Sequence, residues 1–259
     1  MTSEPPSDVS FVVLSNDRYA DVWPGYFTLL FRFWPDLPYK LYLISNHVRF
    51  PDERVIAIQV GDDLSWSQTL ASGLARVPTR HVLLTLEDYY LTAPVDTAKV
   101  RRLHDAMVER GAVYLRLMGA PNPDYPDPHL PEIGMIKKGA AYRTSTQLAF
   151  WDRQTLIDLL EKETVWQFEL TGARRSDRIA APFLSVYAPF LPVPYQQVVR
   201  GGKWTAKEVE FFSGYGIAFD FSKRPIESKF RLWLQTSLLR RILSRLRRAL
   251  FGDPTLGLK

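Results

Sequence analysis

Two adjacent acidic residues, Glu87 and Asp88, follow a strongly apolar run of the chain. The run from His81 to Leu86 does not alternate polar with apolar residues, which predicts a strand buried on both faces inside a parallel sheet. Ligands of open α/β sheets bind at the carboxyl edge of the strands, so these carboxylates would meet phosphate groups or a metal ion. Two carboxylates repel phosphate unless a cation intervenes, and we therefore expect Mg²⁺ or Mn²⁺ at Glu87 and Asp88. The alternative is that they only begin a loop.

Polar residues also follow other predicted strands. The apolar run 9–15 is followed by Asn16 and Asp17, and the run 54–60 is followed by Asp62 and Asp63. Because these exits lie at the same end of the predicted sheet, we expect Asn16, Asp17 and Asp63 to contact the same ligand.

Strand and helix patterns alternate along the chain. Apolar residues recur with helical spacing over 21–34, 65–77, 97–110 and 152–162, and extended patterns occupy 40–45, 112–117 and 141–150. The stretch 119–138 contains five prolines and two glycines without periodicity and is predicted to be a long loop. These patterns predict an α/β protein with a Rossmann-like domain and a mixed central sheet over residues 9–222, after a disordered N-terminus at 1–8.

Several chemistries are excluded by the residues that the chain lacks. It has no cysteine, which excludes disulfides, thiolate metal sites and a cysteine nucleophile. Its four histidines are scattered, so no zinc site is predicted. There is no Gly-x-Gly-x-x-Gly after the first strand, no Gly-x-x-x-x-Gly-Lys-Ser/Thr and no Gly-x-Ser-x-Gly. A dinucleotide oxidoreductase, a P-loop NTPase and a serine hydrolase are therefore not expected.

Four short motifs occur in a characteristic order. They are Asp62-Asp63-Leu64-Ser65-Trp66-Ser67, Leu83-Leu84-Thr85-Leu86-Glu87-Asp88-Tyr89-Tyr90-Leu91, Gln147-Leu148-Ala149-Phe150-Trp151 and Trp166-Gln167-Phe168-Glu169. In order and spacing over residues 9–205, the chain resembles GT-A-type glycosyltransferases of bacterial surface polysaccharide assembly. The resemblance implies a GT-A-like fold and a nucleotide-sugar donor over the carboxyl ends of the N-terminal strands. It departs from the family's Asp-x-Asp motif, because Glu87-Asp88 is followed by Tyr89.

The resemblance also implies a catalytic role for Glu169 as the base of an inverting sugar transfer. The acceptor hydroxyl must lose its proton as it attacks the anomeric carbon, and a carboxylate within hydrogen-bond reach accepts that proton. The alternative is that Glu169 only favours a helix N-terminus.

Further substrate contacts are expected from aromatic and polar residues near these motifs. The tryptophans could stack on a sugar or base, although tryptophan among apolar residues is more often part of the core. A lysine after the Gly201-Gly202 turn could reach a phosphate, although such a lysine is more often only solvated. The expected contacts are Trp66, Gln147, Trp151, Trp166 and Lys203.

The charge of the chain is concentrated near its C-terminus. The 259 residues are 46% hydrophobic and carry a net charge of +5. Nine basic residues and one acidic residue lie between Lys223 and Arg248, so this stretch has a charge of +8 and the remainder −3. A basic tail on a mildly acidic globule indicates an anionic partner for the tail alone.

The basic tail, residues 223–259, also has an apolar stripe. From Leu238 onward, leucines and Ile242 fall on one arc of a predicted helix over 228–251, and arginines fall on the other. This pattern is typical of a helix lying on an anionic bilayer surface, and the stripe argues against nucleic acid as the partner. No run of about 20 apolar residues is present to span a membrane, and the N-terminus lacks a secretory signal.

The sequence thus favours a cytoplasmic glycosyltransferase, peripheral on the inner face of the plasma membrane, that uses a lipid-linked saccharide acceptor. The alternative function is a non-enzymatic protein whose basic tail binds anionic membrane or nucleic acid. The apolar stripe could instead pack on the globule or on a second copy of the chain, in a homo-oligomer.

Overall fold

The computed structural model describes residues 8–62 and 65–227. The expected helix over 228–251 and the predicted ligand contact Asp63 lie outside these residues. The chain divides into two compact units, the first ending at Gln196 and the second beginning at Gln197. This division falls inside the range 9–222 that the sequence predicted to be one domain. None of the helices in the described ranges combines the length and apolarity needed to cross a bilayer.

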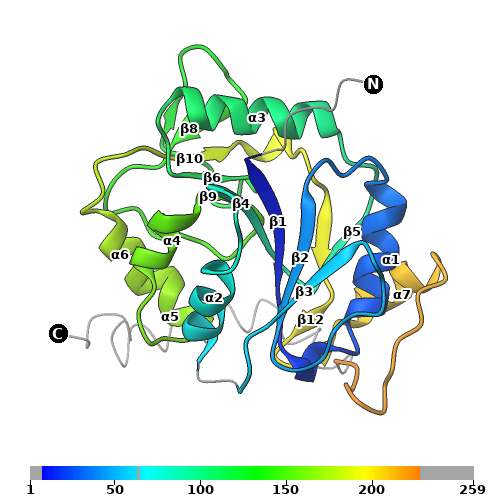
Figure 1. The fold of residues 1–259 in the computed structure, drawn as a ribbon. Helices are drawn as coiled ribbons and strands as arrows, with labels where there is room; N and C mark the ends of the chain where they lie inside the picture. The colour runs from blue at the N-terminus through cyan, green and yellow to red at the C-terminus, as the bar shows by residue number, and fades with distance from the viewer. Residues whose placement is uncertain (1–7, 63–64, 228–259) are drawn as a thin grey trace, which may run out of the picture. The chain divides into compact units, whose positions relative to one another are not determined.

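A nine-stranded mixed sheet forms the centre of the first unit (Figure 1). Its strands are β1 (Val9–Leu14), β2 (Lys40–Ser45), β3 (Val55–Gln59), β4 (His81–Leu86), β6 (Tyr114–Arg116), β7 (Tyr125–Pro126), β8 (Ile133–Met135), β9 (Ala149–Asp152) and β10 (Phe183–Val186). The spatial order is β3-β2-β1-β4-β9-β6-β10-β8-β7. The four strands from β3 to β4 are parallel, and β9 runs antiparallel to both β4 and β6. The predicted mixed α/β fold is therefore confirmed.

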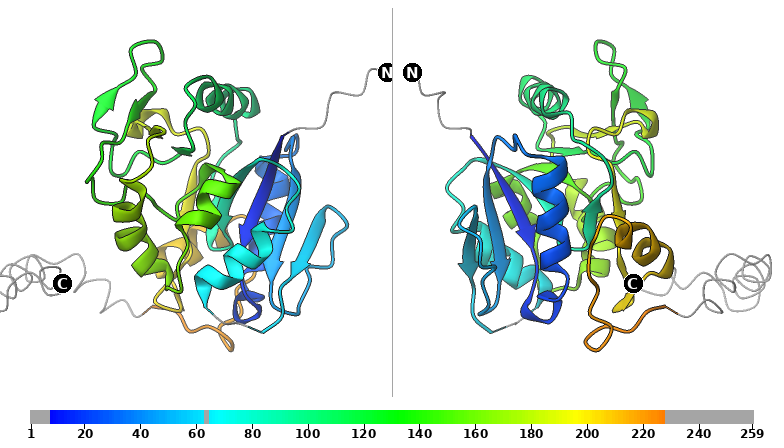
Figure 2. Two further views of the ribbon diagram at one scale, coloured as in Figure 1. Left: turned by 60° about the vertical axis from the view of Figure 1, so that its left-hand side comes forward. Right: turned by 90° about the vertical axis from the view of Figure 1, so that its right-hand side faces the viewer.

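Helices α1 (Trp23–Phe33) and α2 (Trp66–Leu74) cover opposite faces of the parallel strands (Figure 2). Side chains alternate between faces along β1: the Phe11 ring meets Trp34, just past α1, edge-on at 5.7 Å, and Val12 shares a buried cluster with Leu70 of α2. All six residues of β1 are buried, because both faces of the strand are covered.

Two more helices begin at aspartate caps, close to the predicted positions. They are α3 (Thr97–Glu109) and α4 (Arg153–Leu159). The Asp96 carboxylate accepts the Lys99 N–H at 2.9 Å, and the Asp152 carboxylate accepts the Thr155 N–H at 2.9 Å. Each bond satisfies an amide that has no partner inside its helix.

Two stretches differ from their predicted patterns. The predicted loop 119–138 contains the short strands β7 and β8, which extend the sheet beyond β10. In the predicted extended segment 141–150, the strand begins only at Ala149. The residues before it form turns that include Tyr142 at φ 57°, and their hydrogen bonds go to the side chains of Arg116 and Glu169 rather than to a neighbouring strand.

The second unit contains a hairpin of β12 (Val199–Arg200) and β13 (Lys203–Trp204), followed by α7 (Ala206–Ser213). Gly201 and Gly202 form the turn with φ of 55° and 74°, the left-handed pair that a tight hairpin needs. Trp204 is buried, its N–H donates to Pro225 O at 3.0 Å, and its carbonyl accepts the Glu227 N–H at 2.7 Å. The chain up to Glu227 therefore belongs to the folded unit.

Candidate active site

The carboxylates Glu87 and Asp88 lie between β4 and the short strand β5 (Tyr89–Leu91), and only 6% and 7% of their surfaces are exposed. Their charges act on Tyr26 of α1, whose pKa is raised mainly by burial and further by these two carboxylates. Among the described residues, no three acidic or histidine side chains gather into a complete metal site. Mg²⁺ and Mn²⁺ need no such group, because they are held by one or two carboxylates together with phosphates and water. The pair therefore fits the expected metal.

Tyr89 follows Asp88 and stacks on Tyr195, with ring centroids 4.6 Å apart. The second sheet of the unit, β5 paired with β11 (Tyr195–Gln197), holds both rings in place. The Thr146 side chain favours the ionised form of Tyr89 and so opposes the rise of its pKa that burial causes. Burial raises the pKa of Tyr89, and the charges of Tyr195, Asp88 and Glu169 raise it further. The carboxylates of Asp88 and Glu169, far apart in sequence, thus both raise the pKa of the same phenol.

Glu169 is half-buried, and a single oxygen of its carboxylate is held in place. Oε1 accepts hydrogen bonds from Ser145 Oγ at 3.3 Å, Thr146 N at 3.0 Å and Thr146 Oγ1 at 2.9 Å. Within the described part of the chain, no hydrogen bond to Oε2 accompanies them. The carboxylate is therefore oriented through one oxygen, and the other is left to accept a proton.

The helical segment that carries Glu169 changes its winding at this residue. A short α-helix, α5 (Val165–Gln167), is followed by the π-helical turn η2 (Phe168–Gly172) and by α6 (Ala173–Ser176). Thr164 and Gln167 form a reciprocal capping box at the start of α5. π-Turns inside helices are rare overall, and those that occur are often found at functional sites.

The loop that binds Glu169 is anchored by the fully buried Arg116. Its guanidinium donates to Tyr142 O at 3.0 Å, Pro121 O at 2.5 Å, Met118 O at 2.9 Å and Ser185 Oγ at 3.2 Å. Tyr142 has a left-handed backbone that non-glycine residues rarely adopt, and the bond to its carbonyl stabilises this turn. Arg116 therefore fixes the entrance of the loop that ends at Ser145 and Thr146.

Asn16 caps the turn after β1, and Asp17 joins this turn to the end of the neighbouring strand β2. The Asn16 side chain accepts the Arg18 N–H at 3.0 Å. The Asp17 carboxylate accepts the N–H groups of Asn46, His47 and Val48 at 3.0–3.2 Å. These bonds explain both residues as organisers of the loops after β1 and β2, and the Asp17 carboxylate is already occupied by three amides.

The three predicted tryptophans have different environments. Trp151 of β9 is fully buried against Tyr114, with ring centroids 4.2 Å apart, so the predicted stacking of Trp151 on a ligand is wrong for this structure. Trp66 packs on Phe168 of η2 at 5.5 Å. Trp166 is 70% exposed and precedes Glu169 by three residues, which leaves its ring open to a ligand.

The remaining predicted contacts lie in separate parts of the chain. Gln147 follows Thr146 in the loop, and its side-chain oxygen is buried with no hydrogen bond from the described residues. Lys203 belongs to β13, in the second unit.

Sequence reasoning missed Arg116, Thr146 and Tyr195. Arg116 lies in the apolar strand pattern 112–117. An arginine at an expected core position is the one signal that could have indicated its buried role. Thr146 and Tyr195 carry no local signal, because their roles depend on contacts with Glu169 and Tyr89.

No protein-family model and no curated protein sequence matches the chain. Among solved structures it is similar to the mannosyltransferase PcManGT from Pyrobaculum calidifontis in complex with GDP-Man and Mn²⁺. The identity is 12% and the TM-score 0.52, over 96% of this chain and 77% of that chain. S. aureus TarS matches at 12% identity and a TM-score of 0.49, over 95% of this chain and 46% of that chain. TarS 1–349 matches at 11% and 0.44, over 70% and 60%. The chain thus covers less than two thirds of either TarS chain. The likeness to the mannosyltransferase agrees with the GT-A-like fold that the sequence implied.

Proposed function

We propose that the protein is an inverting glycosyltransferase that moves a sugar from a nucleotide-sugar donor to a saccharide acceptor. The observation that carries the proposal is the Glu169 carboxylate, oriented through Oε1 by Ser145 and Thr146, on a fold similar to that of a mannosyltransferase. In this proposal Asp88 serves the donor diphosphate, and Glu169 serves the attacking hydroxyl of the acceptor. Two carboxylates in different environments also divide their roles in glycoside hydrolases, where one acts as acid and the other as base or nucleophile.

Glu169 is the base in this proposal. As the acceptor oxygen bonds to the anomeric carbon, its proton passes to Oε2 of Glu169. The bond from that carbon to the diphosphate oxygen breaks, and its electron pair leaves with the nucleoside diphosphate. Ser145 and Thr146 hold Oε1 and so keep the carboxylate aimed at the acceptor.

Glu87 and Asp88 bind the donor diphosphate through Mg²⁺ or Mn²⁺ in this proposal, and PcManGT is itself in complex with GDP-Man and Mn²⁺. When bound, the metal would neutralise the charge of the leaving diphosphate. Gln147, which directly follows Thr146 in the loop that holds Glu169, is a donor-site residue in this proposal.

We further propose that the acceptor is lipid-linked and belongs to surface polysaccharide assembly, with the enzyme held on the inner face of the plasma membrane. The sequence feature that supports the membrane location is the basic tail with its leucine stripe. A chain ending at Glu227 keeps the contacts between Trp204 and residues 225–227 and removes the predicted helix. Flotation of both chains with phosphatidylglycerol vesicles at low salt tests this part. If the full chain does not float, or if the shortened chain floats equally well, the membrane assignment fails.

Thermal shift with UDP, GDP and CDP, each with Mn²⁺, identifies the nucleotide, because a ligand that binds the folded state raises the melting temperature. The sugar nucleotides of that base are then used in transfer assays with the parent chain and Glu169→Gln. We expect the variant to keep donor affinity and to lose transfer about 10²- to 10⁴-fold. If no nucleotide raises the melting temperature, the non-enzymatic alternative, in which the basic tail binds anionic membrane or nucleic acid, gains support. Retained transfer in Glu169→Gln, or retention of anomeric configuration, would contradict the role of Glu169.

A further inference from the structure

The π-helical turn η2 requires a local cause, because an uninterrupted α-helix has better hydrogen-bond geometry. The cause lies at the end of the turn. The Thr171 hydroxyl is 2.7 Å from Gln167 O and 2.6 Å from Glu163 Oε2, so its single proton is shared between two acceptors. A threonine hydroxyl that bonds a carbonyl four residues earlier is known to bend helices.

Gly172 permits the same turn sterically. A Cβ at this position would lie 2.9 Å from the Phe168 ring and 3.2 Å from Thr144 Oγ1. The Phe168 ring is buried and packs directly on the glycine backbone. Phe168 and Gly172 are the first and last residues of the π-turn, so this contact fixes its two ends against each other.

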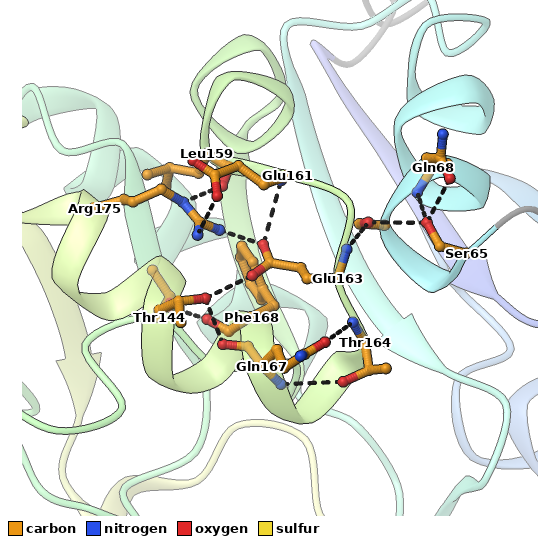
Figure 3. Close-up of polar contacts among 12 residues, drawn as sticks. Ser65, Gln68, Thr144, Leu159, Glu161, Glu163, Thr164, Gln167, Phe168 and Arg175 are labelled. Atoms are coloured by element: carbon orange, nitrogen blue, oxygen red, sulfur yellow. Dashed lines mark hydrogen bonds and ion pairs between the residues drawn. The ribbon is translucent and has the colours of Figure 1, made fainter. Parts of the chain in front are cut away.

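Glu163, the partner of Thr171, is anchored away from the proposed reacting groups. Its carboxylate is buried and pairs with Arg175, and its N–H donates to Ser67 Oγ of α2 at 3.0 Å. Arg175 in turn donates from Nε to Leu159 O of α4 at 2.9 Å. Figure 3 shows Glu163 between Arg175 on one side and the turn at Thr164 and Gln167 on the other. The π-turn is therefore tied to the rigid helices of the first unit.

From these contacts we infer that Thr171 is a positioning residue, which holds the π-turn so that the Glu169 carboxylate meets Thr146. A π-turn contains one residue more than the α-turn that it replaces. Its collapse to α-helix would rotate Glu169 relative to α6 by about 100°, the angle of one residue in an α-helix. The contacts of Oε1 with Ser145 and Thr146 would then be lost. The inference deepens the proposed function and rests on Glu169 as the base.

The test compares Thr171→Val, Thr171→Ser and the control Thr155→Val. Thr155 donates its hydroxyl to Asp152 Oδ1 at 2.9 Å, in the helix α4, which carries none of the proposed reacting groups. The activity readout is nucleoside diphosphate release from the sugar nucleotide selected by thermal shift, with kcat and KM measured separately. We expect Thr171→Val to lower kcat about 10- to 100-fold at unchanged KM for the donor. Thr171→Ser should restore kcat, and Thr155→Val should keep it.

A second readout does not depend on activity. The Thr146 N–H donates to Glu169 Oε1 at 3.0 Å, so its hydrogen exchange, followed by NMR, reports the position of the carboxylate. Exchange at Thr146 should accelerate in Thr171→Val and in Glu169→Ala but not in Thr155→Val. If Thr171→Val only lowers the melting temperature, with kcat and Thr146 exchange unchanged, the positioning role is overturned. The proposed function fails separately, when Glu169→Gln retains transfer.

Discussion

Thr146 donates two hydrogen bonds to the same oxygen of Glu169, from its backbone N–H at 3.0 Å and from its hydroxyl at 2.9 Å. Hydrogen bonds to a charged group are shorter and stronger than those between neutral groups. Because both reach Oε1, they set the direction of the carboxylate and leave Oε2 to the acceptor. The orientation of the proposed base therefore depends on one residue of a loop rather than on its own helix alone.

Replacement of Thr146 by valine should lower kcat about 10-fold and leave donor binding unchanged. The variant keeps the backbone bond and the side-chain shape but loses the hydroxyl, so the carboxylate is less well held. Steady-state kinetics with varied donor separate the two parameters. Thr79→Val is the matched control, because the Thr79 hydroxyl also bonds a side chain, Ser10 Oγ at 2.9 Å. This bond lies near the amino ends of the parallel strands β1 and β4, and Thr146 lies near their carboxyl ends. A kcat equal to that of the parent would contradict the role of the Thr146 hydroxyl.

Asp88→Ala should weaken binding of the nucleoside diphosphate in the presence of Mn²⁺. Removal of one of two carboxylates leaves the metal fewer protein ligands and the diphosphate less compensating charge. Calorimetric titrations with Mn²⁺ and with EDTA measure the metal-dependent part of the affinity. The control is Asp17→Asn, since Asp17 organises backbone amides and its loss should not change the ratio between the two titrations. Equal affinity of parent and Asp88→Ala in both conditions would refute the assignment.

The parts of the site that the sequence could predict follow from local patterns. The run before Glu87 has no exposed polar face because β4 lies inside a sheet covered on both faces, and the two carboxylates follow where the strand ends. The helices over 97–110 and 152–162 are predicted by their apolar spacing, and the structure has them begin after Asp96 and Asp152. Each of these features depends on residues that are close in the sequence.

The parts that the sequence could not predict depend on contacts between distant residues. Trp151 and Trp166 both occur next to apolar residues, yet one is fully buried in β9 and the other is 70% exposed. The π-turn around Glu169 requires the Thr171 contact with Glu163 and the close approach of Phe168 to Gly172, which no periodicity records.

Trp166→Ala should raise the KM for the saccharide acceptor about 10-fold and leave donor affinity unchanged. The ring is open to solvent and lies three residues before the proposed base in the sequence. Stacking contacts of aromatic side chains contribute about 0.5–1.5 kcal/mol, and about 1.4 kcal/mol is a tenfold change in affinity. Leu170, also exposed, lies four residues further along the same segment. Kinetics with varied acceptor test the prediction.

The control for this prediction is Tyr125→Ala. Tyr125 is 51% exposed on β7, at the far end of the sheet from β4, so its loss should not affect the acceptor. If Trp166→Ala and Tyr125→Ala have the same KM for the acceptor as the parent, the proposed stacking of the acceptor sugar on Trp166 is wrong.

His81 and His104 form a partly buried pair, with His81 Nδ1 and His104 Nε2 3.0 Å apart. Burial, and to a smaller extent the neighbouring His81, lower the pKa of His104 to about 4. Burial also lowers the pKa of His81, against the opposing effect of Asp8. Both rings are therefore neutral in the folded protein at pH values where an unfolded histidine already binds a proton.

The stability of the fold should consequently fall as the pH falls through the window between about 6.5, the ordinary pKa of histidine, and about 4. In this window the unfolded chain binds more protons than the folded one, so the contribution of the neutral pair is complete above the window and lost within it. One pKa unit corresponds to about 1.4 kcal/mol, which limits the contribution of His104 to about 3 kcal/mol. Urea unfolding at about pH 7.5, 6 and 4.5 measures how the free energy of unfolding changes across this window. His104→Gln, which stays neutral, should show a smaller loss than the parent, whereas His129→Gln, at an exposed position, should behave like the parent. An equal acid loss in all three proteins would show that the pair does not control the acid stability.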